Sequence, residues 1–233
     1  MTLSEVKHNE SKTFPMVNFK DPSKEGFRYW ILSSLLTISR LHLLNLIDFP
    51  ANKKPLTLDV GCSIGFVTQP LSLRTKTIGL DIDKERVRYA KKLNKLADYI
   101  CCDLCYLPLK ISSIDLVVCA SVLEHIENLS KALEEIKIVL KKQGKLVAGY
   151  PIETRFLEII VKTFWSSESH TWNQTKLLKK HGPSRNPHIH KQSFLDIRKL
   201  LAKNFTLSKR RKTPNNMFPD FLSIYESSLL LRD

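Results

Sequence analysis

Residues 58–68 constrain the fold more than any other part of the sequence. They begin as an apolar strand, pass through a loop built on Gly61, Ser63 and Gly65, and continue into a helix whose first N–H groups lack helical partners. Small residues in such a turn let the backbone approach a bound ligand, and a helix amino terminus favours anionic groups. The segment therefore predicts a ligand-binding strand, loop and helix.

Strands and helices alternate along most of the chain, as indicated by apolar runs and the residues that interrupt them. Strands are predicted at residues 56–60, 77–82, 99–103, 116–120, 145–149, 205–210 and 223–231. Helices are predicted at residues 66–73, 84–96, 129–142, 154–165 and 193–203, the last with Ser193 as its cap. We expect an α/β protein with a Rossmann-like, seven-stranded, mostly parallel sheet, helices on both faces and an antiparallel last strand.

The chain of 233 residues is long enough for one sizeable core with elaborations. We expect three parts: an N-terminal arm and amphipathic helix at 1–54, a ligand-binding half at 55–151, and a lid insertion with the C-terminal strands of the same domain at 152–233. A membrane span over residues 30–47 competes with the helix, but Arg40 and His42 within it argue against spanning.

The formal charge of +14 is distributed unevenly along the chain. Residues 176–212 hold twelve lysines and arginines against one acid, Asp196, so RNA, an acidic protein or an anionic membrane surface are candidate partners there. The N-terminus lacks the pattern of a secretory signal, and the odd number of cysteines suits reduced, packed thiols. We therefore expect a cytoplasmic protein without a transmembrane segment.

Two other ligand chemistries could use the glycine loop. A nicotinamide dinucleotide fold requires G-x-G-x-x-G, whereas this chain has Gly61, Ser63 and then Phe66. The segment 61–65 formally matches G-x-S-x-G, the nucleophile elbow of α/β-hydrolases, with Ser63 as nucleophile. That elbow follows an upstream oxyanion-hole loop, and no glycine-rich loop precedes Gly61. Both alternatives are weak.

Carboxylates at the ends of two adjacent predicted strands favour a third kind of ligand, one that carries a ribose. Asp59 lies at the end of an apolar strand, where a buried charge must be satisfied by donors. Asp81 follows at the end of the next strand and is suitably placed to accept hydrogen bonds from ribose hydroxyls, with Asp83 as the alternative.

The segment around Gly61 resembles motif I of the class I S-adenosylmethionine-dependent methyltransferases, and the likeness continues for about a hundred residues. Residues 78–83 resemble the family's second-strand acidic motif, which implies that Asp81 binds ribose and that Ile82 lies against adenine. Most members carry glycine where this chain has Ser63, so a positive φ there would be unfavourable for this side chain.

Residues 102–108 resemble the family's third-strand motif, which implies contact of Asp103 with the adenine amino group and a backbone donor from Leu104. Residues 114–126 are similar to the ubiquinone and menaquinone biosynthesis methyltransferases and the broad type 11 group, and residues 144–151 to the fifth strand. The resemblance implies S-adenosyl-L-methionine as cofactor. The cofactor-binding residues that we expect are Asp59, Gly61, Ser63, Gly65, Asp81, Ile82, Asp103, Leu104, Cys119 and Ala120.

Methyl transfer from a sulfonium is an in-line displacement that chiefly requires alignment and exclusion of water. A base is needed only for some acceptors, and His125, after the fourth strand, is the candidate because a neutral imidazole suits proton removal near neutral pH. The alternative is that His125 only caps the loop or shapes the pocket. No metal site is expected, since the pair His188 and His190 lacks an evident third ligand.

Three functions are compatible with these features. The first is methylation of a small or lipid-like acceptor, such as a quinone precursor or phenol, beneath the insertion and the N-terminal helix. The second is methylation of RNA or protein drawn in by the basic C-terminal third. The third is a non-catalytic methyltransferase-like binding protein, with Ser63 as a sign of lost activity, although Asp59, Asp81 and Asp103 argue against such a loss.

Overall fold

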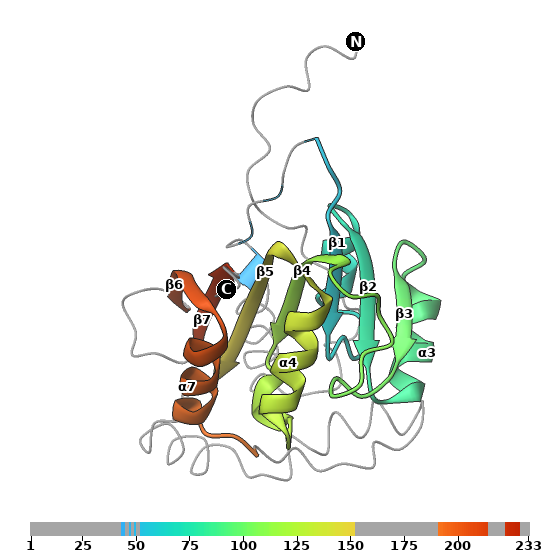
Figure 1. The fold of residues 1–233 in the computed structure, drawn as a ribbon. Helices are drawn as coiled ribbons and strands as arrows, with labels where there is room; N and C mark the ends of the chain where they lie inside the picture. The colour runs from blue at the N-terminus through green and yellow to red at the C-terminus, as the bar shows by residue number, and fades with distance from the viewer. Residues whose placement is uncertain are drawn as a thin grey trace.

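A computed structural model gives the structure of the chain (Figure 1). The described residues are 52–151, 191–213 and 222–228, together with Leu43, Leu44, Ile47 and Phe49. The predicted helix at 154–165 and the histidines of the insertion lie outside the described residues, as does most of the predicted N-terminal helix.

The described strands form one sheet in the order β3-β2-β1-β4-β5-β7-β6 (Figure 1). Strands β1 to β5 are mutually parallel where they pair, and β7 runs antiparallel to both β5 and β6. The parallel five-stranded part confirms the predicted Rossmann-like α/β fold. The strands are β1 (Leu56–Val60), β2 (Lys76–Asp81), β3 (Asp98–Cys101), β4 (Ile114–Ala120), β5 (Leu140–Pro151), β6 (Thr206–Thr213) and β7 (Leu222–Ser228).

Helices follow the strands, and three of them begin at a side-chain cap. Asp83, Asn128 and Ser193 accept hydrogen bonds from N–H groups of the first turns of α3, α4 and α7, which confirms the predicted cap at Ser193. The helices are α2 (Thr68–Ser72), α3 (Lys84–Leu93), α4 (Leu129–Val139) and α7 (Phe194–Asn204), with a short 3₁₀ helix, η1 (Leu123–His125).

Two apolar layers cover the sheet, because successive residues of a strand point to opposite faces. On one face, Val117 of β4 packs in the large core with α4 and α7. On the other face, the neighbouring Val118 packs with α2 and with Leu43 and Leu44. The end of the predicted N-terminal helix therefore packs on the sheet. Gly149 allows this contact, since a Cβ there would lie 2.7 Å from Leu43 Cδ1.

The carboxyl ends of two helices differ from those predicted from the apolar pattern. Helix α4 ends at Val139, not at residue 142, because Leu140 already pairs with Ile114 and starts β5. Helix α3 ends at Leu93, since Asn94 takes an extended conformation and receives Leu96 N–H on its side chain.

No helix in the described part of the chain is long and apolar enough to cross a bilayer.

Candidate functional site

The loop between β1 and α2 has the backbone conformation that the glycine pattern predicts. Gly61 and Gly65 adopt φ of 66° and 94°, in the left-handed region that favours glycine. A Cβ on Gly61 would also collide with the side chain of Val122, so the loop lies directly against the segment that follows β4. Val122 is a contact that the sequence did not reveal.

Ser63 adopts a φ of 49°, which is the conformation in which a serine is disfavoured. The departure from glycine at this position therefore has an energetic consequence. A non-glycine residue in the left-handed region costs about 1–2 kcal/mol. The surrounding contacts hold the residue there despite this cost.

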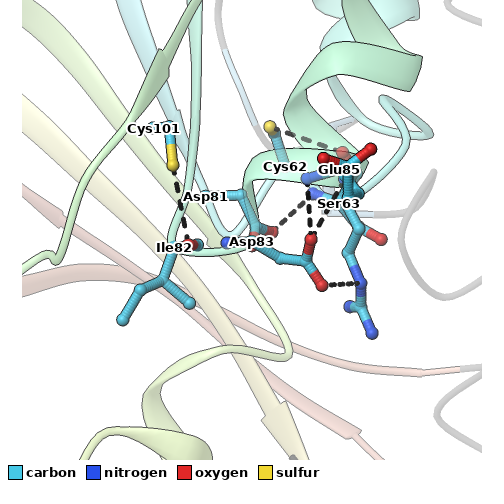
Figure 2. Close-up of polar contacts among 8 residues, drawn as sticks. Cys62, Ser63, Asp81, Ile82, Asp83, Glu85 and Cys101 are labelled. Carbon is cyan, nitrogen blue, oxygen red and sulfur yellow. Dashed lines mark hydrogen bonds and ion pairs between the residues drawn. The ribbon is translucent and has the colours of Figure 1, made fainter. Parts of the chain in front are cut away.

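Asp81 supplies one of those contacts. Its carboxylate accepts a 2.8 Å hydrogen bond from Ser63 N–H and a 2.9 Å hydrogen bond from Asp83 N–H (Figure 2). The residue is only 8% exposed at the end of β2. Because each carboxylate oxygen can accept more than one hydrogen bond, Asp81 anchors the loop and retains acceptor capacity for hydroxyl groups.

Asp83 has a different role from its neighbour. Its side chain accepts hydrogen bonds from Glu85 N–H and Arg86 N–H at the start of α3, and it lies 3.4 Å from the Arg86 guanidinium (Figure 2). Asp83, the predicted alternative to Asp81, is therefore a helix cap. Between the two, Ile82 is 65% exposed and points away from these polar groups.

Asp59 lies beneath the loop and not at its surface. It is 1% exposed and accepts a 2.6 Å hydrogen bond from the hydroxyl of Thr68, the first residue of α2. This bond joins the strand before the loop to the helix after it. Asp59 therefore fixes the ends of the loop, and Thr68 is a second loop-fixing residue that the sequence did not single out.

A thiol and a phenol lie beside this buried carboxylate. Burial raises the pKa of the Cys62 thiol, and the negative charges of Asp59 and Asp81 raise it further. Burial, together with Cys62, raises the pKa of Tyr99 to about 12. The ring of Tyr99 packs closely against Gly79, where a Cβ would lie 2.8 Å from it. These groups are protonated at neutral pH and form the floor under the loop.

The third strand end carries the next pair of predicted residues. Asp103 is exposed, and its side chain accepts a 2.9 Å hydrogen bond from Cys105 N–H. The side chain of Leu104 is buried in the large core, so only its backbone can face a ligand. Cys101 is exposed, contrary to the expectation that all five cysteines are packed, because its Sγ lies at the surface beside the carbonyl of Ile82.

The end of β4 leads into η1. Cys119 is fully buried in the large core, where burial raises the pKa of its thiol, and Ala120 is half-buried at the strand end. His125 is 25% exposed, with Nε2 3.8 Å from Oε1 of the buried Glu124. Its backbone N–H donates to the carbonyl of Val122, so the backbone of η1 is bonded to the residue that contacts Gly61.

The segment that precedes α7 is bonded to this same loop. Lys191 N–H and Gln192 N–H both donate to the carbonyl of Glu124, and the Gln192 side chain donates 3.0 Å hydrogen bonds to the carbonyls of Ile126 and Glu127. The chain therefore leaves the described part at the carboxyl end of β5 and re-enters it beside η1. Nothing in the sequence pattern indicated this connection.

One margin of the sheet, at the carboxyl ends of β1 to β4, holds the predicted site residues. They are the glycine loop, Asp81, Ile82, Asp103 and His125. We call this margin the carboxyl edge. It comprises residues 59–67, 81–86, 102–107, 120–128 and 191–194. Seven acidic residues stand here against three basic ones, which favours a cationic ligand. Among the described residues no group of three metal-ligating side chains is present.

Comparison with known proteins identifies the central part of the chain. Residues 58–148 match the family model described as "Methyltransferase domain". An uncharacterized protein of Methanocaldococcus jannaschii is 41% identical over 97 residues, which are 41% of this chain and 41% of that protein. The human protein "Arginine-hydroxylase NDUFAF5, mitochondrial" is 32% identical over 104 residues, 44% of this chain and 30% of that protein. The matches thus span less than half of these relatives.

Solved structures share the fold over most of the chain. A SAM-dependent methyltransferase from Aquifex aeolicus has a TM-score of 0.58 at 18% identity, covering 84% of this chain and 92% of that one. Magnesium protoporphyrin IX methyltransferase from Synechocystis, with bound SAH, has a TM-score of 0.61 at 19% identity, covering 89% and 90%. Residues 58–148 therefore match a methyltransferase domain, and the chain shares the fold of these solved methyltransferases.

Proposed function

We propose that the chain uses this methyltransferase domain to transfer a methyl group from S-adenosyl-L-methionine to a small-molecule or lipid-like acceptor. The observation that carries the proposal is the direct bond between the glycine loop and the second-strand carboxylate, Ser63 N–H to Asp81 at 2.8 Å. This bond brings the two elements that the family resemblance implies for cofactor binding into one rigid unit.

The residues of the carboxyl edge fit such a cofactor. Gly61 and Gly65 leave the loop without side chains where the backbone turns toward the site. Asp81 retains lone pairs for the ribose hydroxyls, and the exposed Ile82 side chain offers an apolar surface for adenine. Asp103 would accept from the adenine amino group, with Leu104 N–H donating beside it.

The charge of the carboxyl edge also fits. The methyl donor carries a positively charged sulfonium, which supplies an electrophilic methyl group, and the demethylated product lacks that charge. The carboxylates of Asp59, Asp81, Asp103 and Glu124 therefore favour the donor over the product. For a hydroxyl acceptor, His125 would accept the proton at an imidazole nitrogen as the methyl group is transferred.

We further propose that the acceptor enters over η1, next to the point where the chain returns at Lys191. The likeness of residues 114–126 to quinone biosynthesis methyltransferases favours a phenolic or quinone-like acceptor, and five free cysteines suit a reducing compartment such as the cytoplasm. Strands β6 and β7 are assigned to the same domain as the cofactor-binding half.

Two measurements test the proposal. Isothermal titration of the full chain with S-adenosyl-L-methionine should give a saturable heat, and the absence of binding would contradict it. Incubation of the chain with cell extract and methyl-labelled donor should then yield the demethylated cofactor and a labelled extractable metabolite. Label found in RNA or protein would redirect the acceptor, and binding without turnover would indicate a binding protein.

A further inference from the structure

The margin of the sheet opposite the proposed site has a composition of its own. We call it the amino edge, because it contains the turns that lead into the strands and the last turns of the helices. It comprises residues 52–56, 72–76, 90–98, 110–115, 136–145 and 201–207. In Figure 1 it is the upper margin of the sheet, with the carboxyl ends of the strands below.

Basic residues gather at the amino edge. Thirteen lysines and arginines lie in these segments against two acids, Asp98 and Asp115. Nine of the thirteen are exposed and the other four are half-buried. The basic residues are Lys53, Lys54, Arg74, Lys76, Lys91, Lys92, Lys95, Lys110, Lys137, Lys141, Lys142, Lys145 and Lys203.

Contacts join these segments into one surface. Lys76 N–H donates to the carbonyl of Pro55, and Leu56 N–H donates to Asp115, which also pairs with Lys141 at 2.7 Å. The starts of β1, β2, β4 and β5 are thus directly linked.

The helix ends belong to the same surface. The side chain of Asn94 at the end of α3 donates a 3.1 Å hydrogen bond to Ser72 at the end of α2. Ser112 N–H, in the turn before β4, donates a 2.9 Å hydrogen bond to the carbonyl of Ile138 at the end of α4.

Exposed apolar side chains occupy the same surface. Of the nine large hydrophobic residues that are exposed in the described part of the chain, six lie at the amino edge, with exposures between 45% and 68%. These residues lie in the same segments as the lysines. The six are Leu73, Leu93, Leu96, Ile111, Ile138 and Leu207.

We propose that the amino edge binds the surface of a membrane that contains anionic lipid. The negative surface potential of such a membrane attracts lysine side chains. The leucine and isoleucine side chains among them are removed from water when they enter the headgroup region. A single-stranded nucleic acid would instead favour exposed aromatic side chains for stacking, whereas the exposed apolar residues here are aliphatic. The aliphatic residues therefore favour a membrane over a nucleic acid as the partner of the amino edge.

This mode of binding sets the orientation of the domain. The strands run from the amino edge to the carboxyl edge, so the sheet would stand on the membrane with its strands pointing away from it. With β1 spanning five residues, the carboxyl edge would lie roughly 17 Å or more above the contact surface. The proposed site would face the aqueous phase and take acceptors from that side.

Flotation of the full chain with lipid vesicles tests the inference. The wild type should float with vesicles of phosphatidylcholine and phosphatidylglycerol, should stay behind with phosphatidylcholine alone, and should be released by salt. Replacing Lys54, Lys76 and Lys142 together by glutamine should lower the partition coefficient by roughly a hundredfold, since each lysine contributes roughly fivefold. Replacing Leu73 and Leu96 by glutamine should lower it by roughly tenfold or more.

A triple variant of α7 provides the matched control, because its residues are exposed but lie off the amino edge. Leu195→Gln, Arg198→Gln and Lys199→Gln combined should float like the wild type. Circular dichroism and cofactor titration confirm that each variant is folded, which separates this test from that of the proposed function.

Four outcomes would overturn the inference: no flotation, equal flotation without anionic lipid, an equal loss in the control, or no loss in the leucine variant. Retention of an RNA homopolymer at low salt, in place of vesicle binding, would assign the edge to nucleic acid.

Discussion

The two edges of the sheet differ in charge, in exposed surface and in the way they hold their backbone. At the carboxyl edge acidic residues predominate, and the carboxylates of Asp59 and Asp81 are buried and bonded to the loop that they support. At the amino edge lysines predominate, most of them exposed, with aliphatic side chains between them. One sheet thus combines a loop anchored by buried carboxylates at one end with an exposed basic and aliphatic surface at the other.

The largest expected effect is on cofactor affinity, which a substitution at the carboxyl edge should lower and one at the amino edge should not. Asp81→Ala removes the acceptor of two backbone N–H groups and of the proposed ribose hydroxyls. Hydrogen bonds to a charged group contribute about 1.5–3 kcal/mol, so affinity for S-adenosyl-L-methionine should fall roughly a hundredfold or more. Asp98→Ala, at the amino edge, should leave it unchanged in the same calorimetric titration. Equal affinities in both variants would remove Asp81 from the site.

A smaller effect concerns the bond that closes the loop from below. Thr68→Val removes a donor from the buried carboxylate of Asp59, which should destabilise the fold by about 2 kcal/mol and weaken cofactor binding. Thr68→Ser keeps the hydroxyl and should restore most of both. Thr75→Val, at the amino edge, removes a neutral hydroxyl pair and should cost about 1 kcal/mol without changing affinity. Urea unfolding and calorimetry measure the two quantities, and a loss of affinity in Thr75→Val would contradict the assignment.

The amino edge has its own ion pair, which should give the stability of the protein a pH dependence. Burial raises the pKa of Asp115, but the hydrogen bonds from Lys141 and from Leu56 N–H outweigh it and hold the pKa below its usual range. A carboxyl whose folded pKa is lowered stabilises the protein above its unfolded pKa of about 3.9, and this stability is lost as pH falls through the folded pKa.

Lys141→Met should therefore lower the free energy of unfolding by about 1 kcal/mol at neutral pH. It should also flatten the loss of stability that the wild type shows as pH falls below about 3.9. Lys142→Met, which removes an exposed neighbour, should change the free energy by less than about 0.5 kcal/mol. Urea unfolding over this pH range checks both variants, and parallel pH profiles for wild type and Lys141→Met would refute the pairing.

The smallest effect compares one strained serine at each edge. Ser63 and Ser112 have φ of 49° and 53°, so glycine should relieve strain at both positions. Because glycine also adds freedom to the unfolded chain, the net gain should be about 0.5 kcal/mol in each case. Only Ser63→Gly should alter cofactor affinity, by a few-fold tightening. Thermal melts and titrations of the two variants test this, and a tightening in Ser112→Gly would show that the effect is not local.

Much of the fold could be predicted because the central strands β1, β2 and β4 are largely buried on both faces and therefore appear as continuous apolar runs. Strand β1 was predicted at its observed ends, since Pro55 precedes it and Gly61 ends it. Helix ends were less predictable. The end of α4 depends on Leu140 pairing with Ile114, which is a tertiary contact without a local signal.

The candidate site was predictable where a residue type has a characteristic backbone conformation or position. Gly61 and Gly65 take positive φ, and Asp81 lies at a strand end beside them. Two features had no such signal. The contact of Val122 with Gly61 and the hydrogen bonds of Gln192 to the loop after β4 join segments far apart in the sequence, so no spacing pattern encodes them.

The bond from Ser63 N–H to Asp81 has a thermodynamic consequence for ligand binding. A loop that is already fixed by its own strand end has little conformational entropy to lose when a ligand arrives. Association should therefore follow a single fast phase without a slow isomerisation, and the change in heat capacity should be only that of the surface the ligand itself covers. In kinetic terms, the loop behaves as a lock-and-key element built into an unliganded protein.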